Sequence, residues 1–66
     1  MAVEPVIGRC RTNLDNCQAE SWPTSFAAVP RVGELVMSAR GRYLRVCGVS
    51  HYEDEGKPRI LVELNR

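Results

Sequence analysis

The fold of this chain is decided by residues 29–64, which read VPRVGELVMSARGRYLRVCGVSHYEDEGKPRILVEL. Pro30 and Gly33 mark a turn at the start of this stretch, because proline restricts the backbone angle φ and glycine tolerates its positive values. Beyond the turn, apolar and polar residues alternate with a period of two, which is typical of β-strands. The pattern predicts strands at residues 35–39, 43–52 and 59–64.

The longest of these runs contains a glycine at a point where strict alternation fails. Val46 and Val49 would point to opposite faces of a regular strand, and Gly48 lies between them. We expect a β-bulge at Gly48, because an extra residue lets both valines reach the interior while the strand bends. The acidic segment 53–58 is expected to form the turn into the closing strand.

The first third of the chain predicts one more strand and a long connection. Residues 5–14 alternate in the same way, and the inward set is expected to be Val6, Gly8, Cys10, Thr12 and Leu14. Residues 15–29 form the connection, in which Pro23 forbids a continuous helix but allows a short helical turn over residues 23–28. On such a turn Trp22 and Phe26 would share one face and close an end of the fold.

The size and composition of the chain indicate a small globular protein. Its 66 residues are expected to form a single domain, 1–66, with residues 1–4 disordered. Folding a chain of this size hides only about 60% of the surface that the unfolded chain exposes, so a closed sheet without unpaired edges is economical. Four to five short strands joined by Gly, Pro and polar turns predict an all-β fold, a small SH3-like barrel.

Charge and cysteine content bear on the compartment and on partners. The net charge of +1 provides no overall attraction to nucleic acid or to an anionic membrane. The chain has no run of 18 successive apolar residues and no secretion signal at its N-terminus, so we expect a cytoplasmic protein that does not enter the membrane. The odd count of three cysteines fits a reducing compartment.

Residues 29–64 resemble small, mostly uncharacterised bacterial and phage proteins with SH3-like barrels. In these proteins a Pro-x-x-Gly-Asp/Glu-x-Val turn precedes a Tyr-x-x-Val-x-x-Val-x-His strand. The matching positions here are Pro30, Gly33, Glu34, Val36, Tyr43, Val46, Val49 and His51. The resemblance covers about half of the chain and implies the barrel fold, but the family has no settled activity and therefore implies no catalytic residue.

The candidate metal and catalytic residues are Cys10, Cys17, Cys47 and His51. Tetrahedral zinc accepts such ligands, but the separations of six and three residues differ from the closely spaced pairs of zinc knuckles. A disulfide between Cys10 and Cys17 would need an oxidising compartment. A flat strand would separate Cys47 from His51 by about 13 Å, too far for a nucleophile and its base. We therefore expect buried free cysteines, no metal, no cofactor and no enzymatic activity.

An apolar sheet face is the first candidate binding site. With Val36 and the alternate residues of the closing strand inside, other apolar side chains remain on the opposite face, which needs a cover. The cover is either the segment 22–28 of the same chain or another protein, including a second copy. As a non-catalytic protein-binding module, the chain would use Trp22, Leu35, Met37 and Leu61.

A basic and aromatic cluster supports an alternative function, that of a small RNA- or DNA-binding barrel. Arginine side chains hold phosphates while a tyrosine ring stacks on a base. The acidic residues 53–55 are expected to lie near the same sheet and to offset its positive charge. The cluster consists of Arg40, Arg42, Tyr43 and Arg45.

Overall fold

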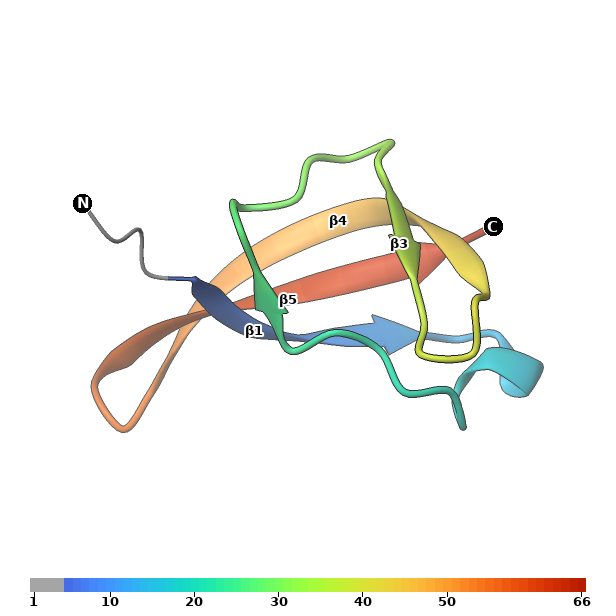
Figure 1. The fold of residues 1–66 in the computed structure, drawn as a ribbon. Helices are drawn as coiled ribbons and strands as arrows, with labels where there is room; N and C mark the ends of the chain where they lie inside the picture. The colour runs from blue at the N-terminus through green and yellow to red at the C-terminus, as the bar shows by residue number, and fades with distance from the viewer. Residues whose placement is uncertain (1–4) are drawn as a thin grey trace.

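The computed structural model describes residues 5–66 and consists almost entirely of β-structure (Figure 1). Its elements are β1 (Val6–Thr12), the 3-10 helix η1 (Asp15–Cys17), β2 (Ser25–Phe26), β3 (Leu35–Met37), β4 (Tyr43–Asp54) and β5 (Lys57–Asn65). The predicted all-β fold with four to five strands is confirmed. The expected disorder of residues 1–4 lies outside the described residues.

The five strands form one curled sheet in the order β2-β1-β5-β4-β3. β1 runs parallel to β5, and every other neighbouring pair is antiparallel. Figure 1 shows the long strands β4 and β5 crossing the whole molecule as one hairpin. Because a sheet of twisted strands curls as strands are added, its two short end strands β2 and β3 can be bridged by a single stretch of chain.

The segment around β2 provides this bridge. The Gly8 N–H donates to the Thr24 carbonyl oxygen at 3.0 Å, and the Ala39 N–H donates to the Ser21 carbonyl oxygen at 2.9 Å. Residues 21–26 are therefore hydrogen-bonded to β1 on one side and to Ala39, which follows β3, on the other. These bonds hold the curled sheet in the shape of a half-barrel, whose end strands β2 and β3 do not pair with each other. We call the contact between Ser21 and Ala39 the seam.

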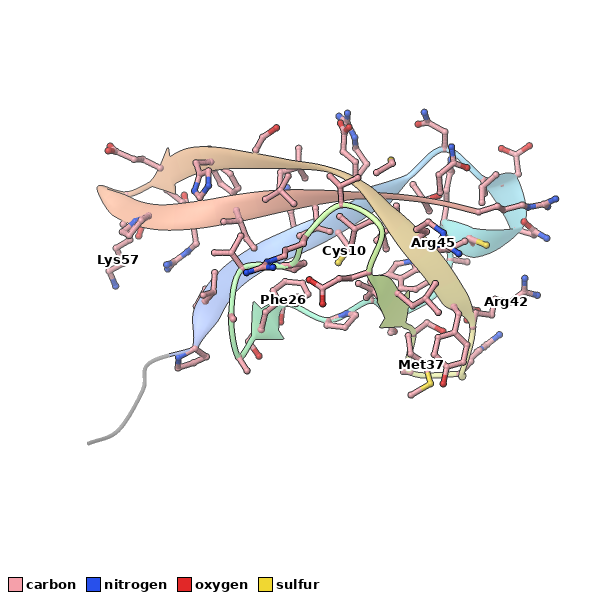
Figure 2. All side chains as sticks on the ribbon, turned by 90° about the horizontal axis from the view of Figure 1, so that it is seen from above. Cys10, Phe26, Met37, Arg42, Arg45 and Lys57 are labelled. Atoms are coloured by element: carbon pink, nitrogen blue, oxygen red, sulfur yellow. The ribbon has the colours of Figure 1, made fainter. Side chains whose placement is uncertain are left out.

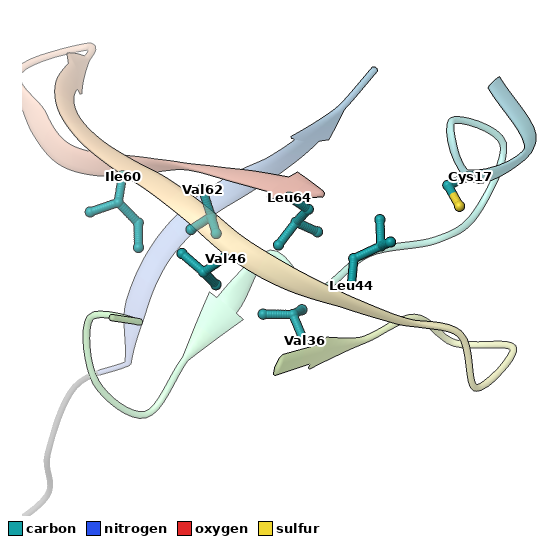
Figure 3. Close-up of a cluster of buried hydrophobic side chains, with 7 residues drawn as sticks. All are labelled: Cys17, Val36, Leu44, Val46, Ile60, Val62 and Leu64. Atoms are coloured by element: carbon teal, nitrogen blue, oxygen red, sulfur yellow. The ribbon is translucent and has the colours of Figure 1, made fainter. Parts of the chain in front are cut away.

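The core fills the inside of the barrel (Figure 3). Val46 and Val62 are its most enclosed side chains, with exposures of 1% and 0%. The buried cluster consists of Cys17, Val36, Leu44, Val46, Ile60, Val62 and Leu64, against which Val6, Cys10, Leu14, Trp22, Phe26 and Val49 pack. The inward residues predicted for the first and the closing strand are confirmed, because alternation directs every second side chain to the same face.

The predicted bulge in the longest strand is also confirmed. The pairing of β4 with β5 shifts between Val46, opposite Leu64, and Gly48, opposite Glu63. Cys47 is the extra residue and is exposed. The shift restores Val49 to the inner face opposite Val62, and Val49 packs against the core.

The short helical turn that the sequence allowed over residues 23–28 does not form, since Ser25 and Phe26 form β2. The reason is the free edge of β1, which bonds to this segment through Gly8 and through the pairs Val6–Phe26 and Ile7–Ser25. The helix of the connection lies earlier, at Asp15–Cys17. Trp22 and Phe26 nevertheless both pack against the core, as expected of large aromatic side chains in a small domain.

Two strand ends also differ from the prediction. β4 and β5 extend to Asp54 and from Lys57, so the acidic turn is only Glu55-Gly56 instead of residues 53–58. Both turn residues have positive φ, 53° and 78°, which is the geometry of a two-residue type I′ hairpin loop. β3 in turn ends at Met37, because the Ser38 N–H already donates to the Arg42 carbonyl oxygen within the next turn.

Candidate protein-binding surface

Three large apolar side chains lie exposed on the outer face of β3 and β4. Leu35, Met37 and Tyr43 have exposures of 57%, 49% and 60%. Met37 and Tyr43 are direct cross-strand partners, and Leu35 is opposite Arg45. Side chains that are opposite each other in an antiparallel pair are in contact range, so these residues form one surface. We call Leu35, Met37 and Tyr43 the β3–β4 patch.

The patch follows from the pleat of β3. Val36 between the two exposed residues is 9% exposed and belongs to the core, so Leu35 and Met37 must point the other way. The same alternation along β4 buries Leu44 and leaves Tyr43 and Arg45 outside. Figure 2 shows Met37 and Arg42 at one end of the molecule, opposite the end that carries Lys57.

The structure brings together only two of the four residues predicted for protein binding. Leu35 and Met37 share the patch, whereas Leu61 lies in the middle of the sheet between Arg9 and Ser50 and is half-buried. Trp22 is also half-buried, and its Nε1–H donates to the Cys17 carbonyl oxygen at 3.1 Å. Trp22 therefore supports the barrel end, while its edge borders a hollow of about 280 Å³ that Met37 also lines.

The residues of the alternative nucleic-acid site lie on the same hairpin as the patch. Tyr43 belongs to both sets, and Arg45 lies beside Leu35 with its Nη1–H donating to the Gly33 carbonyl oxygen at 3.2 Å. The sequence predicted the two sites as alternatives, without placing them relative to each other. The cross-strand register of β3 and β4 combines them into one apolar surface with arginines at its margin.

A carboxylate that sequence reasoning missed lies beside two of these arginines. The Glu20 side chain is only 5% exposed, and its oxygens are 3.9 Å from Arg40 Nη1 and 3.9 Å from Arg42 Nε. Glu20 also accepts a hydrogen bond of 2.8 Å from Ser38 Oγ, which fixes the carboxylate at the seam. The predicted counter-charges Glu53, Asp54 and Glu55 instead belong to the far end of β4 and the turn that follows it.

The free edge of β3 is a further part of this surface that the sequence did not indicate. β3 is an end strand of the sheet and pairs with β4 alone among the described residues. The Glu34 carbonyl oxygen and the Ser38 N–H bond toward β4, at 2.8 Å each, while the Ala39 N–H points the other way to Ser21. Peptide groups alternate along a strand, so those of Leu35 and Met37 point away from β4 toward the open side.

The three cysteines are free thiols in different surroundings. Burial raises the pKa of the Cys10 thiol to about 11, so it stays protonated at neutral pH and is a poor nucleophile. Cys17 is buried in the core, and the exposed Cys47 donates to the Glu63 carbonyl oxygen at 3.4 Å. Across residues 5–66, no three His, Cys, Asp or Glu side chains gather closely enough to hold a metal ion.

The single histidine lies away from the exposed thiol. His51 pairs with Ile60, and three paired residues separate it from Cys47 in the bulge. The exposed imidazole instead borders a cleft of about 530 Å³, whose walls include Val6, Ile60, Lys57 and Arg59. This cleft lies at the end of the molecule remote from the β3–β4 patch.

Comparison with protein-family models, with curated proteins and with solved structures finds no match to this chain. Among the residues that the structure describes, no helix is long and apolar enough to cross a membrane.

Proposed function

We propose that this protein is a non-catalytic protein-binding module whose docking surface is the β3–β4 patch. The observation that carries the proposal is the exposure of Leu35, Met37 and Tyr43, about half or more of each side chain, on one face of one hairpin. Neighbouring apolar side chains left in water on a small protein often mark an interaction site, because covering them is favourable.

The position of the long connection excludes residues 21–26 as a cover of the patch. Residues 21–26 bond to β1 and to Ala39, and Trp22 and Phe26 pack against the core inside the barrel. The segment that the sequence allowed as a lid therefore fills the interior, and Leu35, Met37 and Tyr43 stay open to a partner.

Nucleic-acid binding is the second candidate, supported by the exposed Tyr43 next to Arg42 and Arg45. The buried Glu20 carboxylate weighs against it, since it lies within 4 Å of both Arg40 and Arg42 and reduces the positive potential that phosphates would meet. Protein binding needs no strong positive field and uses the apolar residues directly, so we rank it first.

We also propose a cellular compartment and an origin for the protein. The three free thiols support a reducing compartment, for which we propose the cytoplasm. The turn and strand motifs around Pro30 and Tyr43 support a bacterial or phage origin through their resemblance to small barrels of such proteins. Neither point enters the test of the docking surface.

The test is selection of a random peptide library on the immobilised protein. Selected peptides should bind the wild-type protein and lose about tenfold or more in affinity for a variant with Leu35→Ser and Met37→Ser, because the apolar contact is removed. A matched control carries Ile7→Ser and Val29→Ser, two exposed apolar residues that line the remote cleft.

Circular dichroism should show that both variants keep the fold, since all four residues are exposed. Peptides that bind both variants as tightly as the wild-type protein would contradict the proposal. A selection that enriches no peptide, while an oligonucleotide binds with a steep dependence on salt, would favour the nucleic-acid alternative.

A further inference from the structure

The edge of β3 provides hydrogen-bonding groups in addition to apolar side chains. The directions of the Glu34, Ser38 and Ala39 bonds leave the N–H and C=O groups of Leu35 and Met37 pointing to the open side of the sheet. Two N–H donors and two C=O acceptors are therefore available to an added strand. Such groups at a sheet edge are a known template for pairing with another extended chain.

The seam limits how far an added strand can reach. The Ala39 N–H, next in the alternating series, is already bonded to Ser21, so pairing must stop after Met37. The occupant consequently contributes a core of about three residues, two of which point outward beside Leu35 and Met37. The residue between them points to the inner side, near the hollow lined by Trp22, Pro23 and Ser38, which favours a small apolar side chain.

Positive charge marks both ends of this short edge. Arg45 Nη1 is bonded to the Gly33 carbonyl oxygen, which places its guanidinium just before Leu35. Arg40 follows β3 in the next turn, and its side chain is 82% exposed, so Glu20 at 3.9 Å neutralises it only in part. A carboxylate placed beyond either end of the added three-residue core would meet an arginine.

We propose, on the basis of the protein-binding function above, that the β3–β4 patch binds an extended segment of a partner protein by strand addition to β3. The segment has two apolar residues separated by one small residue, with acidic residues on both sides. Main-chain hydrogen bonds to Leu35 and Met37 provide affinity, and the flanking carboxylates select the partner through Arg45 and Arg40.

Charge favours this occupant over a second copy of the chain. In another copy, Leu35–Met37 is flanked by Glu34 on one side and by Ser38, Ala39 and Arg40 on the other, and Glu34 Oε1 already accepts a hydrogen bond from the Arg31 N–H at 2.6 Å. A β3–β3 contact would therefore bring a second arginine to one end of the edge and, to the other, a single carboxylate that already accepts a backbone hydrogen bond. An acidic segment supplies a free carboxylate at each end.

The test uses three synthetic peptides and the whole chain labelled with nitrogen-15. The first peptide, EEVAVEE with blocked ends, carries the proposed pattern. The second, KKVAVKK, reverses its charge, and the third is EEVAVEE with the three central nitrogens methylated, which removes the strand donors and keeps the side chains. NMR titration measures affinity, and amide hydrogen exchange reports the state of Leu35 and Met37.

The expected result is that EEVAVEE shifts the amide signals of Leu35 and Met37 and slows their exchange. KKVAVKK and the methylated peptide should each bind about tenfold or more weakly. Arg45→Gln should weaken EEVAVEE binding about threefold. Arg9→Gln, which removes an exposed arginine beside Leu61 instead, should leave the affinity unchanged.

Three outcomes would overturn this inference. Equal binding of EEVAVEE and KKVAVKK would rule out selection of an acidic partner. Undiminished binding of the methylated peptide would rule out strand addition as the binding mode. Protection of the Leu35 and Met37 amides without any peptide, together with a dimer in light scattering, would assign the edge to a second copy. Since the library selection depends only on the side chains of the patch, it can succeed when these peptides fail, so the two proposals are separable.

Discussion

At the scale of single residues, Gly8 is required by the parallel pairing of β1 with β5. Gly8 is buried opposite Ile60, and a Cβ built at this position would lie 2.5 Å from Ile60 Cγ1 and closer still to the Ile60 carbonyl oxygen. Most of the atoms that a Cβ would meet belong to the Ile60 backbone, which cannot move without breaking the hydrogen bonds between β1 and β5. Glycine is therefore needed here because two strands approach closely.

Gly8→Ala should lower the free energy of unfolding by about 1–3 kcal/mol, because the added methyl group overpacks the interior. Urea denaturation followed by tryptophan fluorescence measures this change. Gly48→Ala is the control, since its Cβ would meet mainly the end of the Glu63 side chain, at 3.1 Å, which can rotate away. An unchanged urea midpoint for Gly8→Ala, or an equal loss of unfolding free energy in both variants, would show that the close approach of β1 and β5 does not require glycine at position 8.

At the scale of elements, the β4–β5 hairpin has the most extensive strand pairing in the sheet. Its pairing extends from Arg45–Asn65 to Asp54–Lys57 and is closed by Glu55 and Gly56. Glu55 is the single non-glycine residue with positive φ among residues 5–66. A glutamate pays for this conformation with a steric penalty, whereas asparagine adopts it readily in type I′ turns.

Glu55→Asn should therefore raise the free energy of unfolding by about 0.5–1 kcal/mol, and Gly56→Ala should lower it by about 1 kcal/mol. Thermal unfolding monitored by circular dichroism measures both changes. Glu53→Gln, in strand β4 near the same turn, removes the same charge and should change stability by less than about 0.5 kcal/mol. A stabilisation of equal size in that control would attribute the gain to charge instead of turn geometry.

At the scale of the whole molecule, Glu20 ties the long connection to the β3–β4 hairpin. Its carboxylate is almost fully enclosed, accepts the Ser38 Oγ–H hydrogen bond and lies near two arginines, while the neighbouring Ser21 bonds to Ala39. These contacts join residues about 20 positions apart and close the barrel at the seam. The position of the patch therefore depends on a residue outside it.

Glu20→Ala should lower the free energy of unfolding by about 1–3 kcal/mol, because Ser38 loses its hydrogen-bond acceptor and the two arginines lose their counter-charge. Amide exchange of Ala39 should accelerate more than that of Val62, since the seam opens before the core. Glu53→Ala, which truncates an exposed carboxylate, should leave both quantities nearly unchanged. Equal acceleration at Ala39 and Val62 would show that Glu20 stabilises the molecule uniformly and not at the seam.

Much of the fold was predictable because alternation records which side of a strand is buried. The inward positions of Val62 and Leu64, the outward positions of Leu35 and Met37, and the bulge next to Gly48 all follow from it. β2 escaped prediction because it has two residues and exists through its bonds to β1. A segment this short has no period of its own to detect.

The candidate site was predictable only in part. The outward positions of Leu35 and Met37 were expected from sequence, but their union with Tyr43 and Arg45 on one surface depends on the register of β3 and β4. The separation of Leu61 from this surface depends on the same register, since it lies opposite Ser50. Alternation reports the face of a residue and not its position along that face.

The amino-acid sequence by itself determined the class of the fold, the content of the core and the faces of the long strands, since these depend on local period and apolar burial. The tertiary structure alone decided which strand edge stays open, which carboxylate lies beside Arg40 and Arg42, and where the barrel closes. Those features are contacts between distant residues, and a pairing of this kind leaves no repeating pattern along the chain.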